Sequence, residues 1–173
     1  MSSTFTRVIG IDPGPTPGFV GLDIEVPKGE QHGYLVGPPL IVQCSASFAA
    51  VALEGLLTVV DYDRVLVQIE AFVQGNRTRS ARGAGKTTGN MVRDLRGVWL
   101  TFDIEGQWVE RSAAAVKPWA TDARLDAAGL TEATKGMVHA RDAARHAAFR
   151  ACHAGLLPDP LSTAGRKAWK GNR

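Results

Sequence analysis

Residues 7–24, RVIGIDPGPTPGFVGLDI, constrain the fold of this chain more than any other segment. Two apolar runs flank a turn that contains three prolines and two glycines. Proline lacks a backbone N–H and glycine favours turns, so the segment predicts a strand over residues 6–12, a tight turn, and a strand over residues 19–25. The first strand ends on Asp12, which predicts a carboxylate held rigidly at one end of a sheet.

The remaining apolar patterns predict a mixed α/β domain. Short runs rich in β-branched residues predict strands at 40–44, 64–72 and 107–112, with a weak strand at 34–36. Longer segments with apolar residues three and four apart predict helices at 48–60, 88–104 and 134–153. The order βββαβαβα predicts a mixed five-stranded sheet with helices on both faces, within one domain over residues 1–157.

Basic residues are concentrated in two segments. The chain has a formal net charge of +3, yet residues 74–96 carry six basic residues against Asp94 alone, and the last ten residues carry four basic residues and no acidic one. The rest of the chain is therefore acidic overall. An acidic body with two basic segments favours a polyanionic partner, so we expect nucleic acid to bind. We expect residues 158–173 to form a basic, flexible tail.

The sequence favours a cytoplasmic protein. No apolar run is long enough to span a bilayer, and the first residues, MSSTFTR, lack the charged and apolar regions of a signal peptide. Cys44 and Cys152 lie far apart and indicate no disulfide framework.

Four polar residues fall where elements end or share a face. Asp12 ends the first strand, and Glu70 lies near the end of the strand at 64–72, in an otherwise apolar run. His139 and Asp142 are three residues apart, so they project from one face of the last helix. Three carboxylates and one imidazole suit Mg²⁺ or Mn²⁺ better than Zn²⁺. Two such ions about 4 Å apart are typical of phosphodiester hydrolysis.

These motifs together resemble the RuvC family of Holliday-junction resolvases. The resemblance rests on IGIDPG at 9–14, VQIEAF around Glu70, VKPW at 116–119 and HARDAARHA at 139–147, in matching order across almost the whole chain. It implies an RNase H-like fold and a homodimer in which each subunit nicks one of two opposed strands of a four-way junction. The brevity of the chain and its arginine-rich loop are similar to phage-encoded members.

The resemblance also implies roles for individual residues. Asp12, Glu70, His139 and Asp142 would be the metal ligands, and Lys117 would steady the scissile phosphate. Phe72 would be the aromatic residue that enters the junction, and the helix around residues 91–102 would form the dimer. From its charge, we expect the loop at 74–88 to contact DNA phosphates through four basic residues, Arg77, Arg79, Arg82 and Lys86.

Four other interpretations compete. GAGKTT at 83–88 suggests a phosphate-binding loop for ATP, but Ser80 stands where that motif needs glycine. An actin-like ATPase needs two such domains, which this chain is too short to supply. A junction-binding protein without catalysis would not need all four candidate ligands. A nuclease for forks, flaps or structured RNA stays open, because its fold and ligands would be the same.

Overall fold

A mixed β-sheet runs through the centre of the molecule. The computed structural model describes residues 3–58, 62–71 and 79–171, with the backbone alone for 79–87. The strands are β1 (Thr4–Asp12), β2 (Gly18–Val26), β3 (Tyr34–Leu35), β4 (Leu40–Gln43), β5 (Arg64–Glu70) and β6 (Gly106–Arg111). Their order is β3-β2-β1-β5-β6, and β4 also pairs with β2. The pair β1–β2 is antiparallel, whereas β5 lies parallel to both β1 and β6.

The described residues form a sheet of six strands, so the predicted five-stranded count was wrong. β3 pairs with Ile24 and Glu25 of β2, and β4 pairs with residues 18–21 of the same strand. The two short strands are therefore consecutive pieces of one sheet edge. Gly37, with a φ of +80°, and Pro38 and Pro39 separate them, because this backbone cannot continue a ladder.

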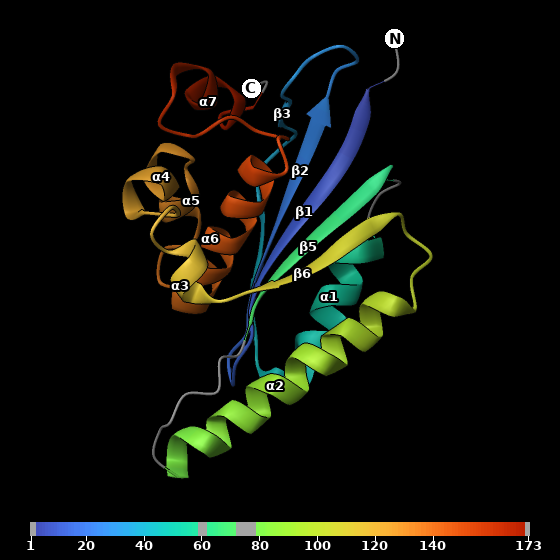
Figure 1. The fold of residues 1–173 in the computed structure, drawn as a ribbon, viewed down its shortest axis with the longest axis vertical. Coiled ribbons are helices and arrows are strands. Elements are labelled where there is room, and N and C mark those ends of the chain that lie inside the picture. The colour runs from blue at the N-terminus through green and yellow to red at the C-terminus, as the bar shows by residue number, and fades with distance from the viewer. Residues whose placement is uncertain (1–2, 59–61, 72–78, 172–173) are drawn as a thin grey trace.

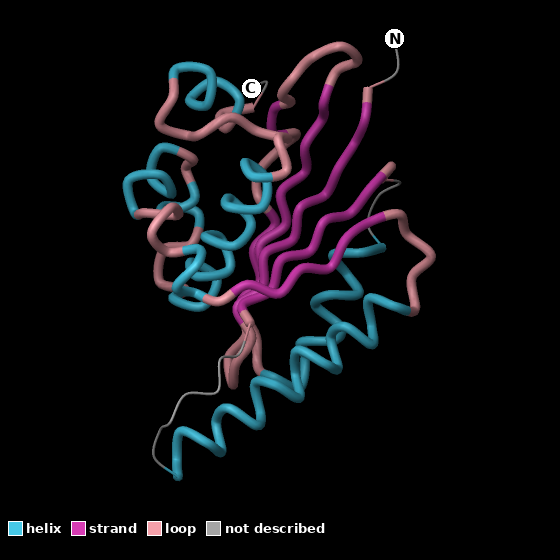
Figure 2. Tube along the Cα trace, viewed as in Figure 1, coloured by secondary structure: helices cyan, strands magenta, loops and turns pink. Residues whose placement is uncertain are grey.

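Helices cover both faces of the sheet, as predicted (Figures 1 and 2). A 3-10 turn (Ala46–Phe48), α1 (Ala49–Thr58) and the long α2 (Arg79–Leu100) lie on one face. The other face carries α3 (Ala113–Val116), α4 (Asp122–Ala127), α5 (Leu130–Ala133), α6 (Val138–His153) and α7 (Thr163–Ala168). Among the residues described, no helix combines the length and apolar character needed to cross a membrane.

Each face of the sheet has its own apolar core because side chains alternate along a strand. In β1, Val8 packs with Leu22 and the alanines of α6, whereas Ile9 and Ile11 pack with α1 and α2. Even-numbered residues of β1 therefore face α6. This alternation decides which residues at the strand end reach the candidate site.

The region predicted as a loop at 74–88 is helical from Arg79 onwards. The sequence suggested a loop because glycine and threonine are frequent there and an apolar stripe begins only at Met91. Alanine, arginine and lysine in the same stretch are strong helix formers, so the helix begins well before its apolar stripe. The connecting segment predicted at 116–135 also holds two short helices, α4 and α5.

The C-terminal segment packs on the domain, which differs from the flexible tail that we expected. Trp169 is 3% exposed, and its Nε1 donates a hydrogen bond to the Pro158 carbonyl at 3.0 Å. The guanidinium of Arg124 donates to both carboxylate oxygens of Asp159. Ser162 begins α7, and its Oγ accepts a hydrogen bond from the backbone N–H of Gly165. A buried tryptophan and a capped helix hold the segment in place despite its basic composition.

Candidate active site

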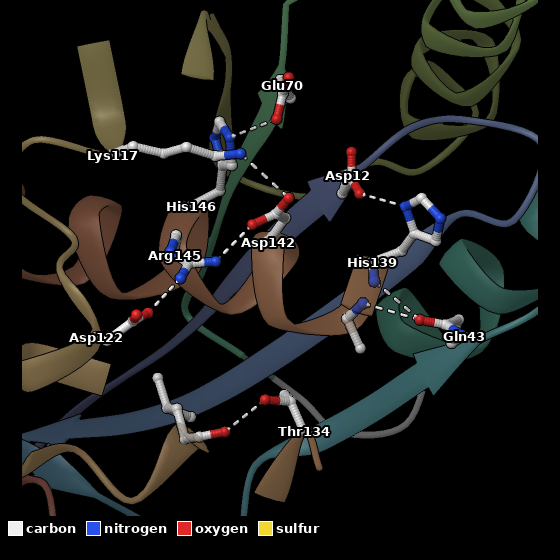
Figure 3. Close-up of polar contacts among 12 residues, drawn as sticks. Asp12, Gln43, Glu70, Lys117, Asp122, Thr134, His139, Asp142, Arg145 and His146 are labelled. Carbon is white, nitrogen blue, oxygen red and sulfur yellow. Dashed lines mark hydrogen bonds and ion pairs between the residues drawn. The ribbon is translucent and has the colours of Figure 1, made fainter. Parts of the chain in front are cut away.

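The register of the two central strands places Asp12 beside Glu70. Ile11 of β1 pairs with Ile69 of β5, so the next residue of each strand lies at the same end of the sheet. Both residues are even-numbered and share the strand face that α6 covers. Figure 3 shows Asp12 at the end of β1, Glu70 on β5 and Asp142 on α6 gathered at this end.

Helix α6 brings His139 into contact with Asp12. The distance from His139 Nδ1 to Asp12 Oδ2 is 2.8 Å. Two glycines allow this helix to lie directly on the strands: a Cβ at Gly10 would lie 2.1 Å from the Ala143 carbonyl oxygen, and one at Gly18 would lie 2.2 Å from the His139 carbonyl carbon. Gly10, the first glycine of IGIDPG, therefore sets the distance between β1 and α6.

Gln43 holds the start of α6, a role that no sequence pattern indicates. Its Oε1 accepts hydrogen bonds from the backbone N–H groups of His139 and Ala140, at 3.0 and 3.2 Å. The first N–H groups of a helix have no partner within the helix, so an acceptor from another element satisfies them. Gln43 ends β4, and it therefore ties the sheet edge to the helix that carries two candidate ligands.

Asp12 lies in an unfavourable environment for a negative charge. Burial raises its pKa, the charges of Glu70 and Asp142 raise it further, and the hydrogen bond from His139 opposes them. The net effect is a pKa above the ordinary value for an aspartate. Such a cluster of carboxylates is stabilised by a bound cation.

Asp142 is held by two basic side chains. Lys117 Nζ lies 3.2 Å from Asp142 Oδ2, and the Arg145 guanidinium donates to Oδ1. Arg145 also pairs with Asp122 of α4. The Lys117 side chain is 49% exposed, so its ion pair with Asp142 is open to solvent. The structure places Lys117 beside Asp142, whereas its predicted contact with the scissile phosphate stays a prediction. The contact of Arg145 with Asp142 was not predicted.

A buried histidine lies behind Glu70. His146 is 1% exposed; its Nε2 lies 3.5 Å from Glu70 Oε2, and its Nδ1 lies 3.3 Å from Gln68 Nε2. An amide nitrogen can only donate, so Nδ1 accepts and the ring proton is on Nε2, facing the carboxylate. The sequence spacing places His146 one turn after Asp142, but no role was predicted for it. Its neighbour His153 stacks on Phe149 at 3.7 Å between ring centroids and is remote from the carboxylates.

The predicted DNA contacts fall in the least described part of the chain. Phe72 and Arg77 lie outside the described residues. Arg79, Arg82 and Lys86 lie in the first turns of α2, where the structure describes the backbone alone. Figure 1 shows that this end of α2 projects beyond the sheet, at the end where β1 finishes.

The four candidate ligands have donor atoms that suit magnesium, but their side chains do not converge on one point. Among the described residues, no three His, Cys, Asp or Glu side chains are already placed to hold one ion. The contacts above show the reason, because Asp142 is turned to Lys117 and Arg145. The residues fit a hard cation by donor type, since three of them supply oxygen and Asp12 is destabilised by the charges that a cation would neutralise.

No family model and no curated protein matches the sequence. The fold is similar to that of T. thermophilus RuvC in complex with Holliday junction substrate, with a TM-score of 0.53 and 17% identity over 86% of this chain and 94% of that chain. The chain has a RuvC-like fold. This confirms the predicted RNase H-like architecture and the resemblance at the level of the fold, whereas a phage origin stays a prediction.

Two further solved structures are similar to this RuvC-like chain at lower TM-scores. One is a Thermus thermophilus RuvC structure, with a TM-score of 0.47 and 16% identity over 86% of this chain and 97% of that one. The other is a complex of Fowlpox virus resolvase and substrate Holliday junction DNA, with a TM-score of 0.43 and 10% identity over 81% of this chain and 91% of that one.

Proposed function

We propose that this protein is a metal-dependent endonuclease that resolves four-way DNA junctions by paired nicks. One observation carries the proposal: Asp12 and Glu70 lie side by side at one end of the sheet, beneath a helix that presents His139 and Asp142. The RuvC-like fold supports this assignment, because the T. thermophilus protein of that fold was solved with a Holliday junction substrate.

Asp12, Glu70, His139 and Asp142 are the residues that would hold the metal. When bound, two Mg²⁺ ions, or Mn²⁺ in their place, supply the charge that activates water and stabilises the departing oxygen. Burial makes Asp12 the least favourable of these carboxylates to leave without a cation. His146 Nε2 lies 3.5 Å from Glu70 Oε2 and has no other partner among the described residues, so it would orient this carboxylate as a second layer of contacts does in metal sites.

Lys117 would contact the scissile phosphate directly. Its ammonium group now pairs with Asp142 at 3.2 Å, and about half of the side chain is exposed. An ammonium group that leaves one carboxylate for a phosphate stabilises the extra negative charge that develops during hydrolysis. Arg145 holds the other oxygen of Asp142 in place when Lys117 moves.

The start of α2 is the proposed contact with the centre of the junction. Arg79, Arg82 and Lys86 are on its first turns, and Phe72 and Arg77 precede it in the sequence. The start of α2 projects beyond the end of the sheet. Basic residues on these turns therefore lie farther from the domain than they would in a loop folded back on it. A homodimer formed through the second half of α2 is part of the proposal, because two subunits are needed for paired nicks.

A panel of DNA substrates tests the proposal. The wild-type protein is incubated with Mg²⁺ and a synthetic four-way junction, and separately with forks, flaps, structured RNA and linear duplex. We expect symmetric nicks in two opposed strands of the junction, with 5′-phosphate and 3′-hydroxyl ends. Equal cutting of forks, flaps or RNA would indicate a nuclease with a broader range of substrates and would contradict selective junction resolution. Junction binding without any cutting would indicate a binding protein that lacks catalysis.

A further inference from the structure

Three arginines lie along the β5–β6 side of the sheet, outside the site described above. Arg111 ends β6 and pairs with Glu70, so it begins the row at the active end. Arg150 of α6 donates a hydrogen bond to Gln107, which pairs with Leu66 nearer the middle of β5. Arg64 is the first residue of β5, at the far end. We call these three residues the arginine row.

Among the described residues, no carboxylate neutralises the positive charges of the row. Within residues 3–58, 62–71 and 88–171, none of the three arginines forms an ion pair with a carboxylate, whereas Arg7, Arg124 and Arg145 all do. The Nε atoms of Arg64 and Arg150 are buried without a hydrogen-bond partner. Burial lowers the pKa of Arg150, and the charges of Arg111 and Arg64 lower it further. Like charges gathered in this way are stabilised by an anion.

The row also presents its guanidinium groups in a fixed arrangement. Arg111 lies over the ring of Phe149, with its Cζ 5.4 Å from the ring centroid. Phe149 is buried and stacks with His153, while Trp119 packs against its edge. The ring of Phe149 therefore supports the Arg111 guanidinium without neutralising its charge. Planar guanidinium groups bind phosphate through two parallel hydrogen bonds.

We propose that Arg64, Arg111 and Arg150 form a track that binds the phosphates of one DNA arm leading away from the cleaved bond. Strand residues rise about 3.3 Å each, so the six residues from Glu70 to Arg64 span roughly 20 Å. Duplex DNA rises about 3.4 Å per base pair, so the track covers roughly six base pairs. A small anion would contact one or two of these arginines, whereas a phosphate backbone contacts all three. The proposal rests on the proposed function, because Glu70 marks the position of the cut.

The test replaces all three arginines with glutamine, which keeps much of the aliphatic stem. Binding to a four-way junction is measured by fluorescence anisotropy in EDTA at several salt concentrations. We expect the variant to bind at least about tenfold more weakly, and the slope of log K against log salt to fall by roughly 2 to 3, since each phosphate contact contributes about 0.9. A control variant, Lys28→Gln with Lys135→Gln, removes two positive charges from exposed positions outside the arginine row and outside both basic segments.

Modified DNA locates the contact. Neutral methylphosphonate linkages placed about three to six nucleotides from the cut should weaken binding of the wild-type protein and of the control variant. They should leave binding of the arginine-row variant unchanged, because its contacts are already lost. If the triple variant does not fold, as judged by its melting curve, Arg111→Gln alone is compared with linkages nearest the cut.

The outcomes separate this proposal from the proposed function. Cleavage of the junction by the wild-type protein, together with equal affinity and salt slope for the arginine-row and control variants, overturns the track and leaves the nuclease intact. A wild-type protein that neither binds nor cuts any junction overturns both proposals.

Discussion

At the level of single residues, Asp12 carries a cost in stability that its proposed role explains. Its residue surface is 9% exposed, and burial together with two neighbouring carboxylates raises its pKa. A carboxyl whose pKa is higher in the folded chain than in the unfolded chain destabilises the fold once it is ionised. Without a cation, Asp12 therefore lowers the stability of the fold at neutral pH.

Replacing Asp12 with asparagine should stabilise the protein when metal is absent. Stability is lost as pH rises through the raised pKa of Asp12 in the folded state, so Asp12→Asn should melt at a higher temperature than the wild type at pH 7 in EDTA. The difference should disappear at acidic pH, where Asp12 is protonated in both folded and unfolded chains. Melting curves from pH 3 to 8 measure this. An Asp12→Asn protein that is less stable at pH 7 would show that the hydrogen bond from His139 outweighs the cost of the charge.

His146 should influence cleavage through Glu70. His146→Leu removes the proton donor behind this carboxylate, so we expect cleavage to fall by roughly 10- to 100-fold while junction affinity is unchanged. His146→Gln places an amide nitrogen near the position of Nε2 and should retain part of the activity. The concentration of Mg²⁺ needed for half-maximal cleavage should rise in the leucine variant. Equal Mg²⁺ requirements for all three proteins would reduce His146 to a packing residue.

At the level of elements, the contact between β1 and α6 determines the site. Gly10 lets the helix backbone approach the strand so closely that an added Cβ would lie 2.4 Å from the Ala147 nitrogen. This contact places His139 on Asp12, and Gln43 holds the same end of the helix. The position of the site therefore depends on backbone packing as well as on the ligands themselves.

Gly10→Ala should displace α6 and reduce both stability and cleavage. The added methyl group meets backbone atoms that cannot move independently, so we expect a loss of about 1 to 3 kcal/mol in the free energy of unfolding. Gly14→Ala is the matched control, because nothing lies within 4 Å of a Cβ there. Chemical denaturation measures the free energy of unfolding of both variants. Equal stability of the two variants would mean that α6 does not lie on β1 as described.

Much of the arrangement of elements follows from local sequence. The β-branched runs that became β1, β2 and β5 are bounded by proline, glycine or charged residues, which makes their ends visible. The first half of α2 was not predicted because its sequence, RSARGAGKT, contains no apolar stripe that a periodicity could reveal. Gly37, Pro38 and Pro39 divided an expected edge into β3 and β4, a division that depends on pairing with β2.

At the level of the whole molecule, the C-terminal segment completes the core between the sheet and α6. Trp169 packs in the same apolar cluster as Val8, Leu22 and Ala147. Trp169→Ala should therefore lower the free energy of unfolding by about 3 to 5 kcal/mol. Lys167→Ala, at an exposed position of α7, is the control and should have little effect. A tail that moves freely would make the two variants indistinguishable in chemical denaturation.

The candidate site was predictable in its ligands but not in its supporting contacts. Strand ends and helix spacing placed Asp12, Glu70, His139 and Asp142 together, and the structure confirms that they lie at one end of the sheet. Gln43 and Gln68 contact α6 from strands that are distant in the sequence, and Arg145 reaches Asp122 on α4. These partners depend on strand register and on the position of α6, which local patterns do not contain.

The most direct test of the central claim is a Mg²⁺ titration of junction cleavage with Asp12→Asn and Asp126→Asn. Asp126 is exposed and remote from the four ligands, so its variant controls for the loss of one carboxylate. We predict that the wild type and Asp126→Asn cut only when Mg²⁺ is present, and that Asp12→Asn binds the junction but does not cut it at any Mg²⁺ concentration. Cleavage in EDTA, or cleavage by Asp12→Asn at the wild-type rate, would contradict the account.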